Sequence, residues 1–267
     1  MIFIGEKING TRKAIQEAIL KRDRAFIEAA ALEQAQAGAD YLDVNAGTSP
    51  DRETDDILWL IGIVQEATDV PICIDSSSPG TLAAALGQVR RTPLVNSVNA
   101  DPARLKAFLP LIREKDAPVI ALALDESKTG MPKTIAERME NIRRVMEAAA
   151  SYGIPEERLF IDPLVMSVAT DDTAGAAVLE AIRAIRAAWP RAHITGGLSN
   201  VSFALPNREL VNRTFLTLAI AAGMDSAVVN PANKALIESL KATELILGND
   251  RFCRAYTKAA RAGFTRK

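Results

Sequence analysis

The stretch Val70–Val98, VPICIDSSSPGTLAAALGQVRRTPLVNSV, contains a strand, a helix and a second strand in succession. Its two apolar runs, Val70–Ile74 and Pro93–Val98, have the length and composition of strands that are buried on both faces. Between them, Ser78 followed by Pro79 is a typical helix start, with serine as the N-cap and proline as the first helical residue. This order of elements predicts two parallel strands joined by a crossover helix.

The same unit repeats along the whole chain. Further short apolar runs alternate with segments of helical spacing, such as Ile57, Leu60 and Ile61. The eight expected strands are Ile2–Ile4, Tyr41–Val44, Val70–Ile74, Pro93–Val98, Pro118–Leu124, Leu159–Ile161, His193–Thr195 and Asp225–Val229. Without a linker between the units, they predict the α/β class: one (β/α)8 TIM barrel in which residues 1–267 form a single domain. The alternative is an open doubly wound sheet, but no G-x-G-x-x-G or P-loop motif follows the first strand.

Composition and charge narrow the class of protein. Of the 267 residues, 48% are hydrophobic, and 32 Lys and Arg balance 33 Asp and Glu, so no global positive charge attracts nucleic acid or an anionic membrane. Two cysteines exclude a disulfide framework. The N-terminal apolar run is too short for a signal peptide, and no uncharged run approaches the roughly 20 residues of a membrane helix. We therefore expect a cytoplasmic protein. The last segment, Asp250–Lys267, is expected to form one more amphipathic helix.

Polar residues follow every expected strand, at the end where barrels of this type build their active sites. They are Glu6 and Asn9, Asp43 and Asn45, Asp75 and Ser76, Asn96 and Asn99, Asp125 and Glu126, Asp162, Ser199 and Asn200, and Asn230. Any one of them is explained as a turn or helix-cap residue, but their recurrence after all eight strands predicts a polar cavity.

The residue types in this cavity indicate its chemistry. The sole histidine, His193, begins a strand and is expected to be structural, so there is no Ser-His-Asp arrangement and we expect the chain to bind no metal. Cys73, inside a strand, is expected to be a buried filler. Asn and Asp present planar pairs of hydrogen-bonding atoms, which suit a flat heterocycle with alternating N–H and C=O groups, such as a pterin or a purine.

Six motifs occur in order along the chain: Ile4-Gly-Glu-Lys-Ile-Asn9, Leu42-Asp-Val-Asn-Ala-Gly47, Cys73-Ile-Asp-Ser-Ser77, Asn96-Ser-Val-Asn99, Ile161-Asp-Pro-Leu164 and Gly196-Gly-Leu-Ser-Asn-Val-Ser202. Together they resemble the methyltetrahydrofolate:corrinoid-protein methyltransferases, which are pterin-binding barrels. The chain is also similar to the folate domain of cobalamin-dependent methionine synthase. The resemblance runs from residue 2 to about residue 247, and only the last motif is specific by itself.

The resemblance implies a role for each matching residue. Asp75, Asn96 and Asp162 would hold the pterin ring, and Asn200 would be the catalytic residue, with its amide at N5, the nitrogen that carries the methyl group. The other implied substrate-binding residues are Gly197, Ser199, Glu6 and Asn9.

The implied reaction moves a methyl group between N5 of tetrahydrofolate, which is a substrate, and the cobalt of a corrinoid. A separate corrinoid protein would supply that group and dock at the C-terminal face of the barrel, because the Asp-x-His-x-x-Gly motif of corrinoid domains fails at Arg191. Members of the family that the chain resembles are homodimers, so the resemblance also implies a homodimer. The direction stays open: the site would serve acetyl-CoA synthesis or the demethylation of methoxy compounds and of methylamines such as glycine betaine.

Two other functions remain as alternatives. A dihydropteroate synthase requires Arg and His near strand eight to hold pyrophosphate, whereas Ser226-Ala-Val-Val-Asn-Pro231 has no basic residue. A non-catalytic folate-binding protein would not need Asn200. Lys128 and Lys133, after strand five, either meet the glutamate tail of folate or are simply solvated.

Overall fold

The computed structural model describes residues 1–128 and 130–264. Within these ranges, eight parallel strands pair in the order β7-β6-β5-β4-β3-β2-β1-β8. They are β1 (Ile2–Asn9), β2 (Tyr41–Asn45), β3 (Ile72–Asp75), β4 (Leu94–Val98), β5 (Val119–Leu122), β6 (Leu159–Asp162), β7 (His193–Ile194) and β8 (Ser226–Val229). Each strand expected from the sequence is present, with ends that differ by a few residues.

The two outer strands of this order nearly close the sheet into a barrel. Gly197, just after β7, bridges to Val228 of β8, and the Val228 amide donates a hydrogen bond to the Gly196 carbonyl at 3.0 Å. The TIM barrel predicted from the sequence is therefore confirmed, and an open doubly wound sheet is excluded.

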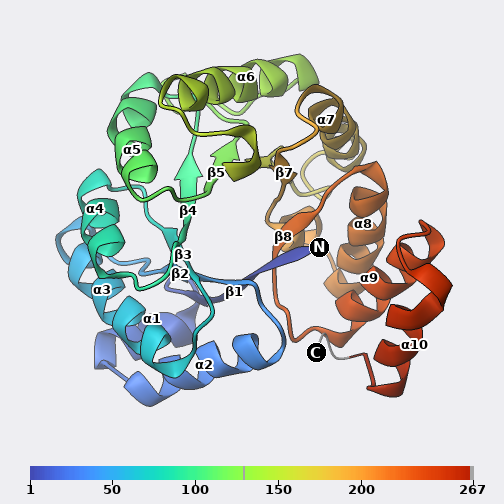
Figure 1. Cartoon of the computed structure of the whole chain (residues 1–267), viewed down its shortest axis with the longest axis horizontal. Helices are drawn as coiled ribbons and strands as arrows, with labels where there is room; N and C mark the ends of the chain where they lie inside the picture. Colours follow the sequence, from blue (N-terminus) through green and yellow to red (C-terminus); the bar gives the residue numbers. More distant parts are fainter. Residues whose placement is uncertain (129, 265–267) are drawn as a thin grey trace.

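Helices surround the strands on the outside (Figure 1). They are α1 (Lys13–Lys21), α2 (Arg24–Gln36), α3 (Pro50–Ala67), α4 (Pro79–Gln88), α5 (Pro102–Glu114), α6 (Ile135–Ser151), α7 (Ala174–Ala188), α8 (Arg208–Ala222), α9 (Lys234–Ile246) and α10 (Arg254–Arg261), with 3-10 turns η1 (Glu156–Arg158), η2 (Leu198–Ser202) and η3 (Arg251–Cys253). In the part of the chain that the structure describes, none of these helices is both long and apolar enough to span a bilayer.

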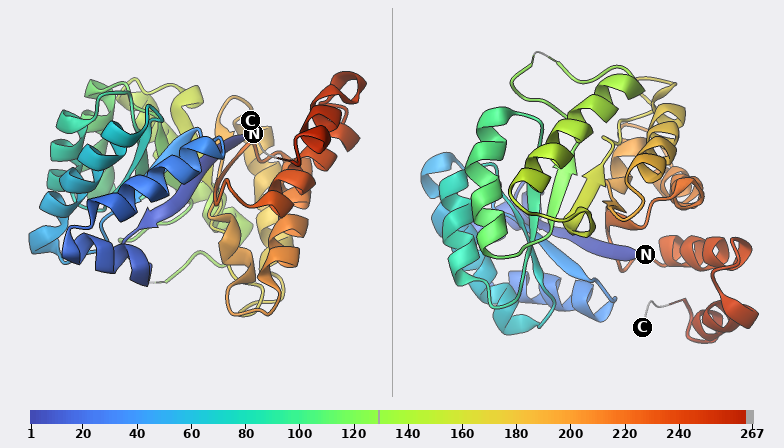
Figure 2. Two further views of the ribbon diagram at one scale, coloured as in Figure 1. Left: turned by 90° about the horizontal axis from the view of Figure 1, so that it is seen from below. Right: turned by 45° about the horizontal axis from the view of Figure 1, so that its top comes forward.

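The C-terminal segment differs from the single helix expected over Asp250–Lys267. It forms η3 and then α10, which lies on the outer side of α9 (Figure 2). Residues 252 and 253 have left-handed backbone angles, with φ of 58° and 55°, and this break separates η3 from α10. Residues 265–267 lie outside the described residues.

The helix starts follow from the capping residues in the sequence. The Ser78 side chain accepts a hydrogen bond from the Thr81 amide at 3.2 Å, at the N-terminus of α4. Thr134 and Glu137 form both hydrogen bonds of a capping box before α6. These bonds satisfy amides that have no partner within the helix, and so they fix where the helices begin.

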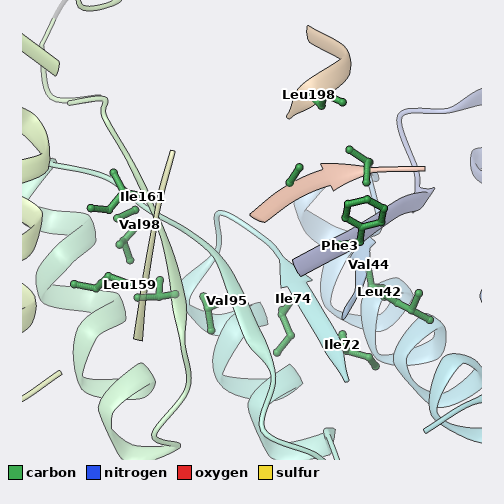
Figure 3. Packing of buried hydrophobic residues seen from close by; sticks show 14 of the residues in the cluster. Phe3, Leu42, Val44, Ile72, Ile74, Val95, Val98, Leu159, Ile161 and Leu198 are labelled. Carbon is green, nitrogen blue, oxygen red and sulfur yellow. The ribbon is translucent and has the colours of Figure 1, made fainter. Parts of the chain in front are cut away.

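Strand alternation separates the core into two layers and positions the site. Side chains such as Leu42, Ile74 and Ile161 point outward and pack beneath the helices (Figure 3). The intervening side chains Ile4, Cys73, Leu94, Ile120 and Phe160 form a second cluster inside the barrel. Because side chains repeat every two residues, the next inward positions along four of these strands are Glu6, Asp75, Asn96 and Asp162.

Candidate active site

These polar positions line a cavity of about 320 Å³ directly above the apolar cluster inside the barrel. The lining is Glu6, Asn9, Thr11, Arg12, Asp43, Asp75, Asn96, Ile120, Asp162, Gly197, Ser199, Asn200 and Val228. All eight site residues predicted from the sequence lie in this one cavity. Gly197, Ser199 and Asn200 reach it from η2 and the residue just before it, and the carboxylates come from the strands.

Three carboxylates face the cavity: Asp43 is buried, and Asp75 and Asp162 are partly buried. Asp43 is 3% exposed and accepts a hydrogen bond from Asn96 Nδ2 at 3.2 Å. Asp162 Oδ1 accepts one from the Leu164 amide at 2.8 Å. Asp75 lies at the end of β3, next to Asn96 of β4. Neighbouring strands thus bring acceptor groups together around one space.

Burial changes the proton affinity of these carboxylates. It raises the pKa of Asp75 to about 8, and the negative charge of Asp43 adds to this effect. It also raises the pKa of Asp43 and of Asp162 to about 6, against opposing hydrogen bonds from Asn96 and from Leu164 respectively. For each carboxylate the loss of solvation outweighs the opposing hydrogen bonds, so a ligand that presents N–H groups would stabilise its ionised form.

The Asn200 side chain lies over a glycine. A Cβ atom on Gly197 would stand only 2.9 Å from Asn200 Nδ2, so the absence of a side chain at 197 leaves room for this amide. Arg208 holds the turn from outside, because its Nη2 donates to the Ser199 carbonyl at 2.7 Å and its Nε to Ser202 Oγ at 3.0 Å. The amide therefore projects from a fixed 3-10 turn.

The rim adds residues to which the sequence analysis gave no role. Arg12 Nη2 lies 3.0 Å from Glu6 Oε1, and Thr11 Oγ1 donates to Asn9 Oδ1 at 2.6 Å. Thr11 and Arg12 follow the first motif in a loop, where sequence periodicity carries no signal. Asp43 was placed at a strand end without a role, although it has the same strand parity as Tyr41, which packs against the inner cluster, and thus points inward.

Other candidate residues lie elsewhere. His193, at the start of β7, stacks on Phe160 with ring centroids 4.5 Å apart and places Nδ1 3.0 Å from Asp225 Oδ2. Cys73 is fully buried, as expected of a filler. Neither Lys128 nor Lys133 belongs to the cavity lining, and Lys128 Nζ lies 3.6 Å from Asp125.

Across residues 1–128 and 130–264, no three His, Cys, Asp or Glu side chains are grouped so that they could hold a metal ion.

Comparisons with known proteins show the family to which the chain belongs. The family described as pterin binding enzyme matches residues 5–230. A methylcorrinoid:tetrahydrofolate methyltransferase from Eubacterium limosum is 41% identical over 263 residues, covering 98% of this chain and 97% of that protein. A methionine synthase from Mycobacterium tuberculosis is 30% identical over 249 residues, which are 88% of this chain and 21% of that protein.

Solved structures show the same fold. Dihydropteroate synthase from Coxiella burnetii in complex with pteroic acid has a TM-score of 0.71 at 18% identity, covering 94% of this chain and 93% of that one. The Xanthomonas albilineans enzyme in complex with 7,8-dihydropteroate has a TM-score of 0.66 at 21% identity, with 92% of each chain covered.

Proposed function

Since this chain belongs to the pterin binding enzyme family, we propose that it transfers a methyl group between the cobalt of a corrinoid protein and N5 of tetrahydrofolate. The observation that carries this proposal is the single cavity that holds Asp75, Asn96, Asp162 and Asn200 together. The similarity to a methylcorrinoid:tetrahydrofolate methyltransferase over almost the whole chain supports methyl transfer from the corrinoid to tetrahydrofolate as the physiological direction.

The cavity suits the edge of a pterin ring. Its 2-amino group and ring N–H are donors, and Asp75 and Asp162 are partly buried acceptors whose pKa values desolvation raises. Each charge-assisted hydrogen bond would contribute about 1.5–3 kcal/mol. Asn96 can both donate and accept, although its Nδ2 already donates to Asp43.

Asn200 would act at N5. In the transfer to tetrahydrofolate, the N5 lone pair forms the new N–C bond, the methyl group leaves cobalt without the bonding electron pair so that Co(III) becomes Co(I), and N5 releases its proton. In the reverse direction the N5 anion would be too basic to leave, so N5 must receive a proton or a hydrogen bond. An amide that can donate or accept serves both directions, and the turn held by Arg208 keeps it in place.

A dihydropteroate synthase is the less favoured function. Among the described lining residues, the one cation is Arg12, which is paired with Glu6, and His193 lies at the opposite end of its strand. This leaves no basic pair at the end of β8 for a pyrophosphate group. The dihydropteroate synthase structures share the fold at low sequence identity, whereas the methyltransferase relative matches at 41%.

The position of the cavity also supports proposals about assembly. It opens at the C-terminal ends of the strands, so the corrinoid protein would dock on that face and supply the cobalt.

We further propose a single-domain protein that acts in the cytoplasm as a homodimer. Light scattering coupled to gel filtration would test the dimer.

The decisive experiment follows the cobalt spectrum under anaerobic conditions. Methylcobalamin, or a methylated corrinoid protein, is mixed with tetrahydrofolate, and the reverse reaction is followed from methyltetrahydrofolate and Co(I). We expect Asn200→Ala to lower the rate by about 10²–10³-fold, as for loss of one preorganised donor, with a much smaller loss of folate affinity. Asn249→Ala, an exposed asparagine after α9, is the matched control and should keep the full rate.

Each outcome separates one part of the proposal from another. Equal losses in rate and affinity would reduce Asn200 to a binding residue. Folate binding without transfer from a cognate methylated corrinoid protein would favour a binding-only protein. A wild-type protein that does not bind folate would refute the pterin site itself.

A further inference from the structure

A buried arginine lies directly behind the strand that carries Asp162. Arg138, in the first turn of α6, is only 6% exposed, and its Nη1 donates to the carbonyl oxygens of Pro163 at 2.9 Å and Leu164 at 3.3 Å. Within the described parts of the chain, Arg138 forms no ion pair with a carboxylate. Burying such a charge costs several kcal/mol unless nearby groups compensate for it.

The segment that Arg138 contacts is the turn that leaves β6. Leu164 has a left-handed backbone with φ of 66°, a conformation that side chains other than glycine rarely adopt. Its amide donates to Asp162 Oδ1 at 2.8 Å. Because Arg138 binds two successive carbonyls of this turn, it stabilises the conformation that orients the Asp162 carboxylate.

Arg138 also affects Asp162 through its charge. Burial raises the pKa of Asp162 to about 6, while the Leu164 amide and the positive charge of Arg138 oppose this rise. The other ionisable groups nearby are acidic: Asp43 and Asp75 line the same cavity, and Asp171 acts on Arg138 itself.

The neighbouring strands add no charge next to Asp162. On the β5 side the cavity lining is Ile120, and on the β7 side lies Gly196, on which a Cβ atom would stand 3.5 Å from Asp162 Oδ1. Arg138 is therefore the cation that acts on this carboxylate among the described residues.

We propose that Arg138 is a positioning residue for the pterin site, which fixes the turn after β6 and keeps the Asp162 carboxylate ionised for the ring. The choice of ligand rests on the proposed function, but the effect on Asp162 does not. The nearest sequence signal is an arginine one residue after the capping-box glutamate, which by itself indicates only a helix start.

The test compares Arg138→Gln and Arg138→Lys with a matched control. Arg144, on the same helix, binds the Asp125 carboxylate at 2.6 Å and the Ala100 carbonyl at 2.9 Å, away from Asp162. Arg144→Gln thus removes a partly buried arginine that also binds a backbone carbonyl, without removing charge from the cavity. The dissociation constant of methyltetrahydrofolate is measured from pH 5 to pH 8 for each variant, and the melting temperature reports on folding.

For Arg138→Gln, we expect the pH below which folate affinity falls to move upward by about one unit. Well below the wild-type midpoint, this shift is a tenfold loss of folate affinity relative to the wild-type protein. Arg138→Lys keeps the charge but not the planar pair of donors, so it should restore the pH dependence more than the affinity. Arg144→Gln should leave the pH dependence unchanged. An unchanged pH dependence in Arg138→Gln, with only a uniform loss of affinity, would overturn the proposal.

A second measurement needs no folate. Carboxyl carbon signals of aspartate-labelled, folate-free protein are followed by NMR against pH, with Asp162→Asn used to identify the Asp162 signal. A higher pKa of Asp162 in Arg138→Gln than in the wild-type protein supports the proposal. If the glutamine variant does not fold, a smaller rise in Arg138→Lys supports it. No change in the pKa of Asp162 refutes it. If the wild-type protein fails to bind folate, the proposed function fails while this titration still decides the role of Arg138.

Discussion

The contact between Gly197 and Asn200 gives a sharp test of the catalytic assignment. In Gly197→Ala, the new Cβ would lie 2.9 Å from Asn200 Nδ2, whereas ordinary contacts begin near 3.4 Å, so the amide must move by about half an ångström or more. Gly197 has φ of −68°, which alanine adopts without strain. The substitution therefore displaces the end of one side chain and leaves the backbone intact.

The expected loss of rate follows from this displacement. Misplacing a reacting group by about 1 Å can cost about 10²-fold, and loss of a donor costs about 10²–10³-fold. We expect Gly197→Ala to lower the rate of methyl transfer by about 10- to 10²-fold, less than Asn200→Ala. The double variant should be no slower than Asn200→Ala, because both changes affect the same amide. The free energy of unfolding should change by less than about 1 kcal/mol.

The assay is the anaerobic cobalt spectrum, with urea unfolding as the measure of stability. Gly87→Ala in α4 is the control, because its Cβ would meet no atom within 4 Å. It should keep the full rate and raise the free energy of unfolding by about 0.5–1 kcal/mol, as expected for a helical glycine. A Gly197→Ala protein with the wild-type rate would refute the reasoning, and so would additive losses in the double variant.

Three further predictions concern protons and helix caps. The pKa of Asp75 is about 8 in the folded protein and ordinarily 3.8, so between these pH values the folded protein binds more protons than the unfolded chain. The free energy of unfolding should therefore fall as pH rises. In urea titrations, Asp75→Asn should flatten this fall between pH 6 and pH 8. Folate binding at pH 7 should release a proton from Asp75, which calorimetry in buffers of different ionisation enthalpy would detect and Asp75→Asn would abolish. Ser78→Ala should cost about 1 kcal/mol in thermal unfolding, since the Thr81 amide loses its acceptor.

The fold was readable from the sequence because parallel strands buried on both faces require continuous apolar runs. The strand ends were less accurate where polar residues extend a strand or glycines end one. β1 continues to Asn9 through Glu6 and Lys7, whose polar side chains suggested an earlier end. β7 stops at Ile194, because the chain then turns through Gly196 and Gly197 into η2. Local hydropathy does not report either event.

The residues that meet in the cavity were also predicted from the sequence, whereas the electrostatics of the cavity were not. The motifs named the residues that meet in the cavity, and the alternation of side chains along each strand explains why they face inward. The pKa of Asp75 depends on Asp43, thirty-two positions away. The conformation around Asp162 depends on Arg138 of a preceding helix. Such pairings arise only when distant segments pack together, so no spacing rule predicts them.

The same carboxylates explain why this cavity is adapted to binding a ligand and not to stability. In the folate-free protein, desolvation raises the pKa values of Asp43, Asp75 and Asp162 despite the opposing hydrogen bonds, so ionising these side chains in the folded protein is unfavourable. A pterin would supply N–H groups, so part of the cost of folding around these carboxylates would return as binding energy. A variant that neutralises one of them should therefore gain stability at neutral pH and lose folate affinity together, a linked change that a purely structural carboxylate would not show.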